Sequence, residues 1–283
     1  MWYPFPVLHQ PGPPFYDGDQ SELFGVVFDA LRNSGRVGFL DSDDMAPLDE
    51  FHPLGRSATL ALADLAGVSP GEQVIDVGAG LGGASRFLAR YHGAKVTALD
   101  ATPRFNALNE VFCDRSRLED KVKVMRGDAR RMPISGPTFD VAWTQALWQE
   151  IEDKERLAAE LHRVVVPGGR LAVFEIVSGP GGELHYPLPW ADGPETCFPM
   201  ESGEMRKLLF RAEFKEKAWL EGPEVLAAAR EAVDGTYGAK KGEGLDGVDL
   251  RLIVHGLTER MATLTRNIEE NRIGLVMGVL SRD

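Results

Sequence analysis

The sequence predicts an α/β fold in which helices cover both faces of a largely parallel sheet. Between residues 73 and 178, short apolar segments alternate with segments of helical periodicity, as in a chain of strands joined by helices. The first apolar segment ends at a cluster of glycines that opens a helix, which is typical of this class. The 283 residues are 43% hydrophobic and 26% charged, so the chain can bury the core of one large domain.

The N-terminal part predicts an arm and two helices. Residues 1–18 are rich in proline and aromatic residues, and we expect an irregular arm that packs on the rest of the protein. Apolar residues recur at helical spacing from Ser21, and a stretch rich in Gly and Asp follows over 35–49. A second helix is expected over 52–66, ended by Gly67.

The remaining segments continue the alternation. Strands are expected over 74–77, 95–99, 122–125, 139–143 and 170–177, the last after Pro167-Gly168-Gly169. Helices are expected between them over 84–90, 105–118 and 154–165. Beyond Ser178 the sequence predicts helices over 201–212, 223–234 and 249–270, a glycine-rich loop over 235–247, and strands over 214–220 and 273–280.

Charge and cysteine content exclude several classes of function. The net charge of −12 repels a nucleic-acid backbone, and no basic patch reverses it. Two cysteines, Cys113 and Cys197, form neither a disulfide framework nor a zinc site, so no metal is expected. The first twenty residues do not resemble a signal peptide, and no apolar run spans a bilayer. We expect a soluble, cytoplasmic protein whose partner is a small molecule and not a nucleic acid or a membrane. The sequence is also compatible with a homodimer.

The glycine cluster after the first strand predicts a nucleotide-type ligand site. The strand carries Asp76 and is followed by Gly78, Gly80 and Gly82. Glycine is needed where the backbone turns sharply and where a ligand approaches closer than a Cβ permits. The Asp76 carboxylate can attract a cationic ligand group. Dinucleotide enzymes share such turns, and Gly83 keeps their G-x-G-x-x-G spacing open.

Asp100 ends the second strand, eighteen positions after Gly82. A carboxylate there can accept hydrogen bonds from both ribose hydroxyls. Enzymes that bind NAD use the same arrangement, so Asp100 indicates an adenosine ligand without choosing the cofactor.

Five segments together resemble the class I S-adenosylmethionine-dependent methyltransferases, in that family's order and spacing. They are Asp76 to Gly82, Asp100, Gly127-Asp128-Ala129, Phe139-Asp140-Val141 and Val166 to Gly169. The resemblance covers roughly residues 70–180. It implies a Rossmann-like seven-stranded sheet whose last strand is antiparallel, and S-adenosylmethionine as the cofactor.

The resemblance also implies roles for individual residues. Gly78, Gly80 and Gly82 would face the methionine part of the cofactor, and Asp100 the ribose. Ala101 is also expected to bind the cofactor. Asp128 would bind the adenine amino group, with the Ala129 amide near the ring. Gln145 would lie beside the methionine part. Tyr16 could lie over the cofactor, or it could hold the N-terminal arm in place.

Within this family the chain is similar to the small-molecule branch that includes sarcosine and dimethylglycine N-methyltransferases. The residues that carry this similarity are Tyr16-Asp17, the segment beginning at His52, Trp143 to Gln145, Pro189 to Ala191 and Asn267 to Asn271. Many relatives carry Asp directly after the glutamine and His four residues later, where this chain has Ala146 and Glu150. A mechanism that relies on that histidine is therefore in doubt here.

Methyl transfer is an in-line displacement, so the protein mainly has to align the reactants. The acceptor would be an amine nitrogen or a hydroxyl oxygen, and a general base is needed only if it arrives protonated. Glu150 and Glu175, which follow or end strands, could anchor an ammonium group or accept a proton. His52 could reach the site from the N-terminal helix, and Trp148 and Trp190 could form walls of the pocket.

Three regions follow from this interpretation. Residues 1–68 would cover the active site, 69–180 would form the cofactor-binding core, and 181–283 would complete the sheet and cover the substrate. Two alternatives stay open at this point. One is an S-adenosylmethionine-binding protein of the same fold that catalyses another reaction such as cyclisation. The other is a NAD-dependent oxidoreductase.

Overall fold

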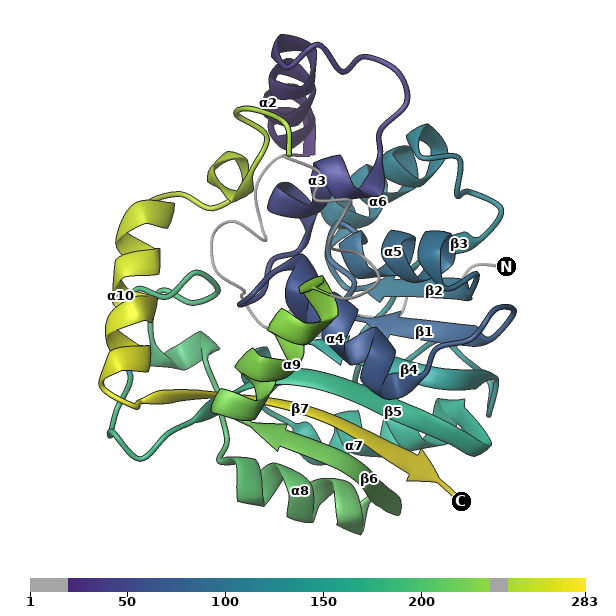
Figure 1. Ribbon diagram of the computed structural model, residues 1–283, viewed down its shortest axis with the longest axis vertical. Helices are drawn as coiled ribbons and strands as arrows, with labels where there is room; N and C mark the ends of the chain where they lie inside the picture. The colour runs from purple at the N-terminus through teal and green to yellow at the C-terminus, as the bar shows by residue number, and fades with distance from the viewer. Residues whose placement is uncertain (1–19, 235–243) are drawn as a thin grey trace, which may run out of the picture.

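A seven-stranded sheet forms the centre of the computed structural model, which describes residues 20–234 and 244–283 (Figure 1). The strand order is β3-β2-β1-β4-β5-β7-β6. Strands β1 to β5 are parallel, and β7 is antiparallel to both of its neighbours. The strands are β1 Gln73–Val77, β2 Lys95–Asp100, β3 Val122–Arg126, β4 Phe139–Gln145, β5 Val165–Ser178, β6 Phe214–Glu221 and β7 Ile273–Arg282. This confirms the Rossmann-like α/β sheet with an antiparallel last strand.

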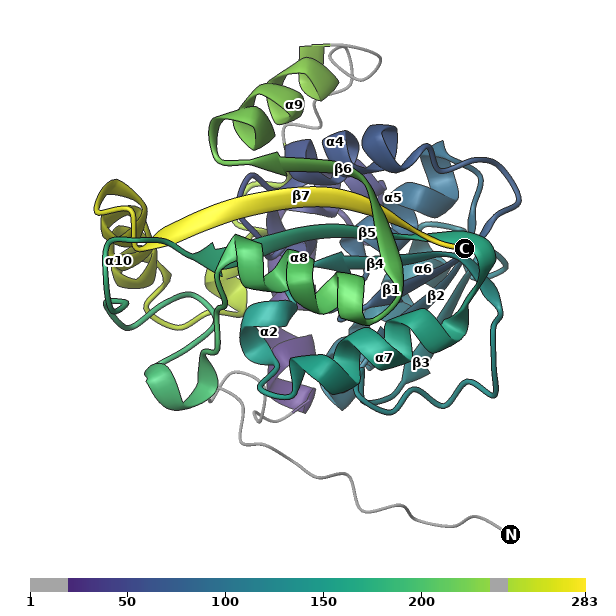
Figure 2. The same cartoon turned by 90° about the horizontal axis from the view of Figure 1, so that it is seen from below.

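Helices pack on both faces of the sheet (Figure 2). One hydrophobic cluster joins α4 Arg56–Ala66, α5 Gly83–Tyr91 and α9 Pro223–Asp234 to one face. A second cluster joins α7 Lys154–Val164 and α8 Ser202–Arg211 to the other. Because both faces are covered, the central strands are almost continuously apolar, which is why short apolar segments predicted them.

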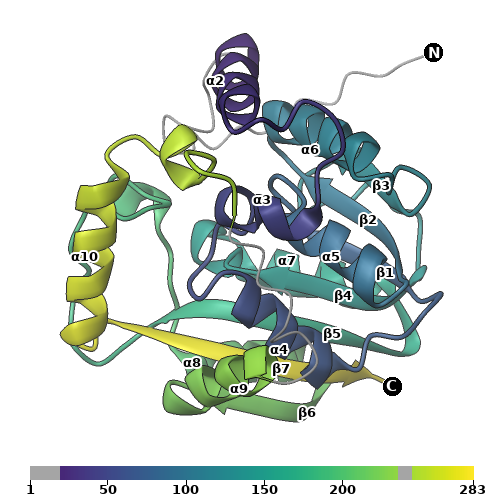
Figure 3. The same ribbon diagram turned by 45° about the horizontal axis from the view of Figure 1, so that its top comes forward.

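Two further hydrophobic clusters lie at the carboxyl ends of the parallel strands (Figure 3). One joins α2 Gln20–Asn33, α3 Ser42–Asp49 and η3 Leu250–Leu252 to α6 Pro103–Arg115. The other joins α10 Leu257–Glu269 to a segment that contains Leu188 and Trp190. Elements from both ends of the chain therefore cover the same edge of the sheet. No helix within the two described ranges is long and apolar enough to cross a membrane.

Several boundaries differ from the prediction for local physical reasons. The fifth strand begins at Val165, and Pro167-Gly168-Gly169 forms a bulge inside it, where β5 carries extra residues opposite the step from Phe139 to Val141. The helix expected over 249–270 is two helices, because Gly256 adopts a left-handed conformation with φ of 67°. The stretch over 35–49 contains α3, whose first turn is capped by the Asp41 side chain.

Candidate functional site

A cavity of about 670 Å³ opens at the carboxyl edge of the sheet, where the turns after β1, β2, β3 and β4 meet. Parallel strands place their carboxyl ends at one edge, so residues far apart in sequence converge there. Most residues predicted for the site line this cavity: His52, Asp76, Gly78, Gly80, Asp100, Ala101, Asp128, Ala129, Gln145 and Glu150. Gly82 and Glu175 do not. Tyr16 lies outside the described residues.

The three glycines after β1 serve different purposes. All adopt positive φ angles, of 80° at Gly78, 54° at Gly80 and 81° at Gly82. A Cβ on Gly80 would meet no atom of the described residues within 4 Å, so among these residues its backbone borders open cavity. A Cβ on Gly82 would lie 2.0 Å from the Oδ1 atom of Asn109. Gly82 therefore makes room for α6, in contrast to the ligand contact that the resemblance implied.

Gly83 also has a packing role. A Cβ at this position would lie 2.6 Å from the backbone oxygen of Asp49 on α3. The fourth glycine of the turn thus allows the N-terminal cover to approach α5. The packing of Gly83 against α3 therefore explains why the sequence contains the G-x-G-x-x-G spacing that dinucleotide enzymes share.

Asp100 joins the glycine turn to the start of α6. Its Oδ2 atom accepts a hydrogen bond from the Gly80 amide at 2.8 Å, and its Oδ1 atom accepts one from the Thr102 amide at 2.8 Å. Burial raises the pKa of Asp100, and the two amides oppose that rise. The carboxylate is therefore held at the cavity edge by backbone groups rather than by a counter-ion.

Asp76 is a second carboxyl group at the cavity. It is only 3% exposed and accepts a hydrogen bond from the Ser85 hydroxyl at 2.6 Å. Burial raises its pKa to about 6, the Ser85 hydrogen bond opposes this, and the charge of Asp100 adds to the rise. A cation that entered the cavity would favour the ionised form of Asp76.

The turn after β3 carries an ion pair that the sequence did not indicate. Both carboxylate oxygens of Asp128 accept hydrogen bonds from the Arg130 guanidinium, from Nε at 3.0 Å and from a terminal nitrogen at 2.8 Å. Although partial burial opposes it, the Arg130 side chain holds the pKa of Asp128 below its usual value. A ligand amino group at Asp128 would therefore share a carboxylate that already binds Arg130.

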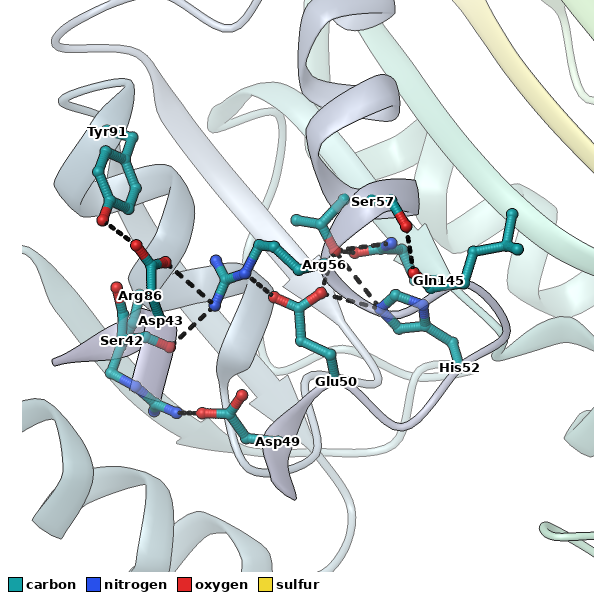
Figure 4. Close-up of polar contacts among 12 residues, drawn as sticks. Ser42, Asp43, Asp49, Glu50, His52, Arg56, Ser57, Arg86, Tyr91 and Gln145 are labelled. Carbon is teal, nitrogen blue, oxygen red and sulfur yellow. Dashed lines mark hydrogen bonds and ion pairs between the residues drawn. The ribbon is translucent and has the colours of Figure 1, made fainter. Parts of the chain in front are cut away.

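Gln145 ends β4 and connects the sheet to the N-terminal cover. Its Oε1 atom accepts a hydrogen bond from Trp143 Nε1 at 2.8 Å, and its Nε2 atom donates to the Thr59 hydroxyl at 3.2 Å. The Thr59 hydroxyl donates to Glu50 at 2.6 Å. Figure 4 shows Glu50 between Arg56 and His52, with Gln145 close to His52. The cavity wall is thus a hydrogen-bonded network that spans α4, β4 and the segment before α4.

Glu50 carries the charge of that network. Its carboxylate is buried and forms an ion pair with Arg56 Nε at 2.8 Å. Burial alone would raise the pKa of Glu50, but Arg56, His52 and Thr59 together hold it below its usual value. Sequence reasoning missed Glu50, Arg56 and Thr59, because the segment around Glu50 has no periodic pattern and Thr59 lies within an ordinary helix.

His52 lines the cavity from a loop rather than from a helix. The helix expected to begin at residue 52 begins at Arg56. Gly55 adopts a φ of 47° and Pro53 restricts the backbone before it, so residues 52–55 lie outside the helix. His52 Nε2 lies 3.4 Å from the Thr59 hydroxyl, and Nδ1 lies 3.2 Å from the Pro53 oxygen. The ring packs edge-on against Phe174. Its position beside the cavity is therefore fixed on several sides.

The two candidate acids occupy different environments. Glu150, on η1 Trp148–Glu150, lines the cavity together with Glu152 and Glu195. Glu175, on β5, is 0% exposed and lies outside the cavity lining. Burial raises the pKa of Glu175 to about 7, although hydrogen bonds from its neighbours oppose this. Only Glu150 is placed where a ligand can reach it.

The two tryptophans proposed as walls are core residues instead. Trp148 is 1% exposed and Trp190 is 5% exposed, and neither lines the cavity. Three phenylalanines supply the aromatic lining: Phe51, Phe105 and Phe198. Among residues 20–234 and 244–283, no group of three or more His, Cys, Asp or Glu side chains has an arrangement that could hold a metal ion.

Comparison with known proteins agrees with this architecture. Residues 75–173 match the methyltransferase domain family. A Streptomyces halstedii protein named methyltransferase GfsG is 32% identical over 179 residues, which cover 59% of this chain and 63% of that protein. A glycine/sarcosine/dimethylglycine N-methyltransferase from Actinopolyspora halophila is 31% identical over 123 residues, which cover 44% of this chain and 22% of that protein. The matched region spans less than two thirds of either relative.

The fold likeness extends over nearly the whole chain. A geranyl diphosphate C-methyltransferase from Streptomyces coelicolor A3(2) superimposes with a TM-score of 0.64 at 15% identity, covering 97% of this chain and 100% of that one. At this identity the likeness concerns the fold. Residues 75–173 are therefore similar to the methyltransferase domain family, and the chain shares the fold of the solved structure.

Proposed function

We propose that the protein transfers a methyl group from S-adenosylmethionine to a small-molecule amine or hydroxyl acceptor. The observation that carries this proposal is the open backbone at Gly80, held by the Asp100 carboxylate at the edge of a 670 Å³ cavity. A cavity of this size suits a cofactor together with a small acceptor, since small-molecule sites are typically about 300–1,000 Å³. The methyltransferase domain match over residues 75–173 supports the same reaction class.

The residues around the glycine turn fit this cofactor. Asp100 would bind the ribose hydroxyls, and Asp128 and Ala129 would lie at the adenine. Ala101, next to Asp100, would also contact the cofactor. Gly78, Gly80 and Gln145 would border the methionine part, and Asp76 would face its positive charge. When bound, S-adenosylmethionine supplies an already activated methyl group. The protein's own task is to orient the acceptor and exclude water.

The charge of the cavity lining favours a neutral or cationic acceptor. Glu150, Glu152 and Glu195 line it. Among the described lining residues, Arg130 is the one Lys or Arg side chain, and it is paired with Asp128. A carboxylate or phosphate on the acceptor would meet repulsion from the three glutamates without a matching cation.

His52 and Glu150 are the proposed catalytic residues. His52 lies at the cavity beside buried Glu50, so its imidazole can accept a proton from a hydroxyl acceptor. Glu150 can anchor an ammonium group or accept its proton. A base is needed only when the acceptor arrives protonated, so loss of His52 should impair a hydroxyl acceptor more than a neutral amine.

The three-region division follows the same proposal. The clusters around α2, α3 and α10 cover the carboxyl edge, as expected of regions that shape a substrate pocket. Residues 1–68 and 181–283 would then select the acceptor, and 69–180 would bind the cofactor. The homodimer that the sequence allows stays a prediction.

Incubation with methyl-labelled S-adenosylmethionine and a panel of amines, alcohols and phenols, followed by mass spectrometry, tests the proposal. We expect an acceptor heavier by one labelled methyl group and an equal amount of S-adenosylhomocysteine. Glu150→Gln and His52→Asn, assayed on each acceptor, assign the two side chains. Saturable cofactor binding with an isomerised but unmethylated acceptor would point to cyclisation, and thermal stabilisation by NAD alone would point to an oxidoreductase.

A further inference from the structure

Glu175 is buried directly behind the loop that follows β4. Its Oε2 atom accepts hydrogen bonds from the amides of Leu147 at 2.9 Å and Trp148 at 3.1 Å. The preceding residue, Ala146, has a φ of 50°, a left-handed conformation that side chains other than glycine rarely adopt. This turn aims two consecutive N–H groups into the protein, where each needs an acceptor. Glu175 supplies that acceptor for both.

The loop that Glu175 holds is a wall of the cavity. Its residues Ala146, Leu147, Glu150 and Ile151 all line the cavity. The Leu147 side chain packs against the glycine turn, since a Cβ on Gly78 would lie 2.8 Å from its Cδ1 atom. The position of Leu147 therefore sets the distance between this wall and the backbone at Gly78.

Lys154 holds the same loop from its other end. Its ammonium group donates hydrogen bonds to the Trp148 oxygen at 2.9 Å and to the Ile151 oxygen. The side chain is buried, at 7% exposure. Trp148 is thus held through its N–H by Glu175 and through its oxygen by Lys154, so the loop is fixed by two buried side chains, a carboxyl group and an amino group.

We propose that Glu175 is a positioning residue, whose side chain fixes the loop over residues 146–151 and thereby the cavity wall without contacting the acceptor. The effect on methyl transfer rests on the proposed function; the effect on the loop does not. A catalytic role would require Glu175 to reach the reacting atoms, and it lies outside the cavity lining.

Two variants distinguish a positioning role of Glu175 from a catalytic role. In Glu175→Gln the amide oxygen can still accept both backbone N–H groups, whereas the side chain can no longer take up a proton near neutral pH. In Glu175→Ala both N–H groups lose their acceptor. Glu150→Gln serves as a control that alters a cavity carboxylate without removing a backbone acceptor from Leu147 or Trp148.

The primary measurement is hydrogen exchange at the amides of Leu147 and Trp148. We expect exchange in Glu175→Gln within a few-fold of the unaltered protein, and exchange at least about tenfold faster in Glu175→Ala. Affinity for S-adenosylhomocysteine, measured by calorimetry, should fall in Glu175→Ala and not in Glu175→Gln. The rate of methyl transfer should likewise fall in Glu175→Ala and not in Glu175→Gln.

Two results would overturn the proposal. One is unchanged exchange in Glu175→Ala. The other is a Glu175→Gln protein with slow exchange and normal affinity but a loss of methyl transfer beyond about a hundredfold, as expected of a proton-transfer residue. If Glu175→Ala does not fold, Glu175→Gln alone decides. If no acceptor is methylated at all, the function proposed above fails, while exchange still tests the role of Glu175.

Discussion

The Asp100 carboxylate and the Gly80 amide are joined by a 2.8 Å hydrogen bond across the gap between the ends of β2 and β1. This contact uses one lone pair of the carboxylate to hold the glycine turn, and the hydrogen bond from the Thr102 amide uses a second. The remaining acceptor capacity faces the cavity. The same side chain therefore shapes the edge of the cavity and is available to bind a ligand.

Replacing Asp100 by Ala should weaken binding of S-adenosylhomocysteine by about 1–3 kcal/mol, roughly five- to 150-fold. Both the proposed ribose contact and the support of Gly80 are lost. Isothermal titration calorimetry measures the change. Asp120→Ala, which removes an exposed carboxylate of the same type, is the control. Unchanged affinity in Asp100→Ala would refute the ribose assignment.

Substitution by Ala should have different effects on stability and cofactor affinity at Gly80 and at Gly82. A Cβ at Gly82 would collide with the buried Asn109 side chain, so Gly82→Ala should lower the midpoint of thermal unfolding. A Cβ at Gly80 meets open space but adds the backbone strain of a positive φ, of about 1 kcal/mol, and intrudes on a bound ligand. Gly80→Ala should therefore lose more cofactor affinity than stability. Calorimetric binding and thermal unfolding of both variants test this contrast.

The strands and the glycine turn could be predicted because their signals are local. Buried strands are short apolar runs, and residues at their carboxyl ends meet at one edge whatever their separation in sequence. The Gln145–Thr59 contact joins positions 86 residues apart, and no local pattern reports it. The helix α3 was missed for a similar reason, since its last residue, Asp49, is held by an ion pair with Arg86 on α5.

Assigning a residue to a strand does not predict its contacts, as Glu175 shows. The sequence located it correctly near the end of the fifth strand, and successive side chains on a strand alternate between faces. Which neighbours it meets depends on the left-handed turn at Ala146, and an alanine gives no sign of such a turn. The position was predictable, but the contact was not.

The buried pair of Asp49 and Arg86 predicts a large loss of stability when it is broken. Both side chains are 0% exposed, and Arg86 also donates to the Leu81 oxygen at 2.7 Å and to Asn109 at 2.8 Å. Arg86→Met leaves the Asp49 carboxylate without its cation, so the free energy of unfolding should fall by about 3–5 kcal/mol at pH 8. Urea unfolding measures it.

The pH dependence of that loss gives a second check. Burial raises the pKa of Asp49 to about 6 even though Arg86 opposes the rise, and the pKa should be higher still without Arg86. At pH 5 the variant can protonate Asp49 and avoid a buried unpaired charge. Its deficit should therefore be smaller at pH 5 than at pH 8. The double variant Asp49→Asn with Arg86→Met should recover part of the stability at pH 8, and an equal deficit at both pH values would contradict this account.

Because of Glu175, the free energy of unfolding should change with pH in the opposite direction from the change that an exposed, salt-bridged acid causes. Its pKa is raised from 4.5 to about 7 by burial, so between these values the unfolded chain has released the proton and the folded protein retains it. The free energy of unfolding should therefore decrease as the pH rises from 5 to 7. Glu175→Gln cannot titrate and should lose this contribution, of about 2 kcal/mol over that interval. Comparing urea unfolding of both proteins at pH 5 and pH 7 isolates Glu175, because Asp49 and Asp76 titrate in both. Parallel pH dependence in the two proteins would show that Glu175 is ionised throughout, held by the Leu147 and Trp148 amides more strongly than burial opposes it.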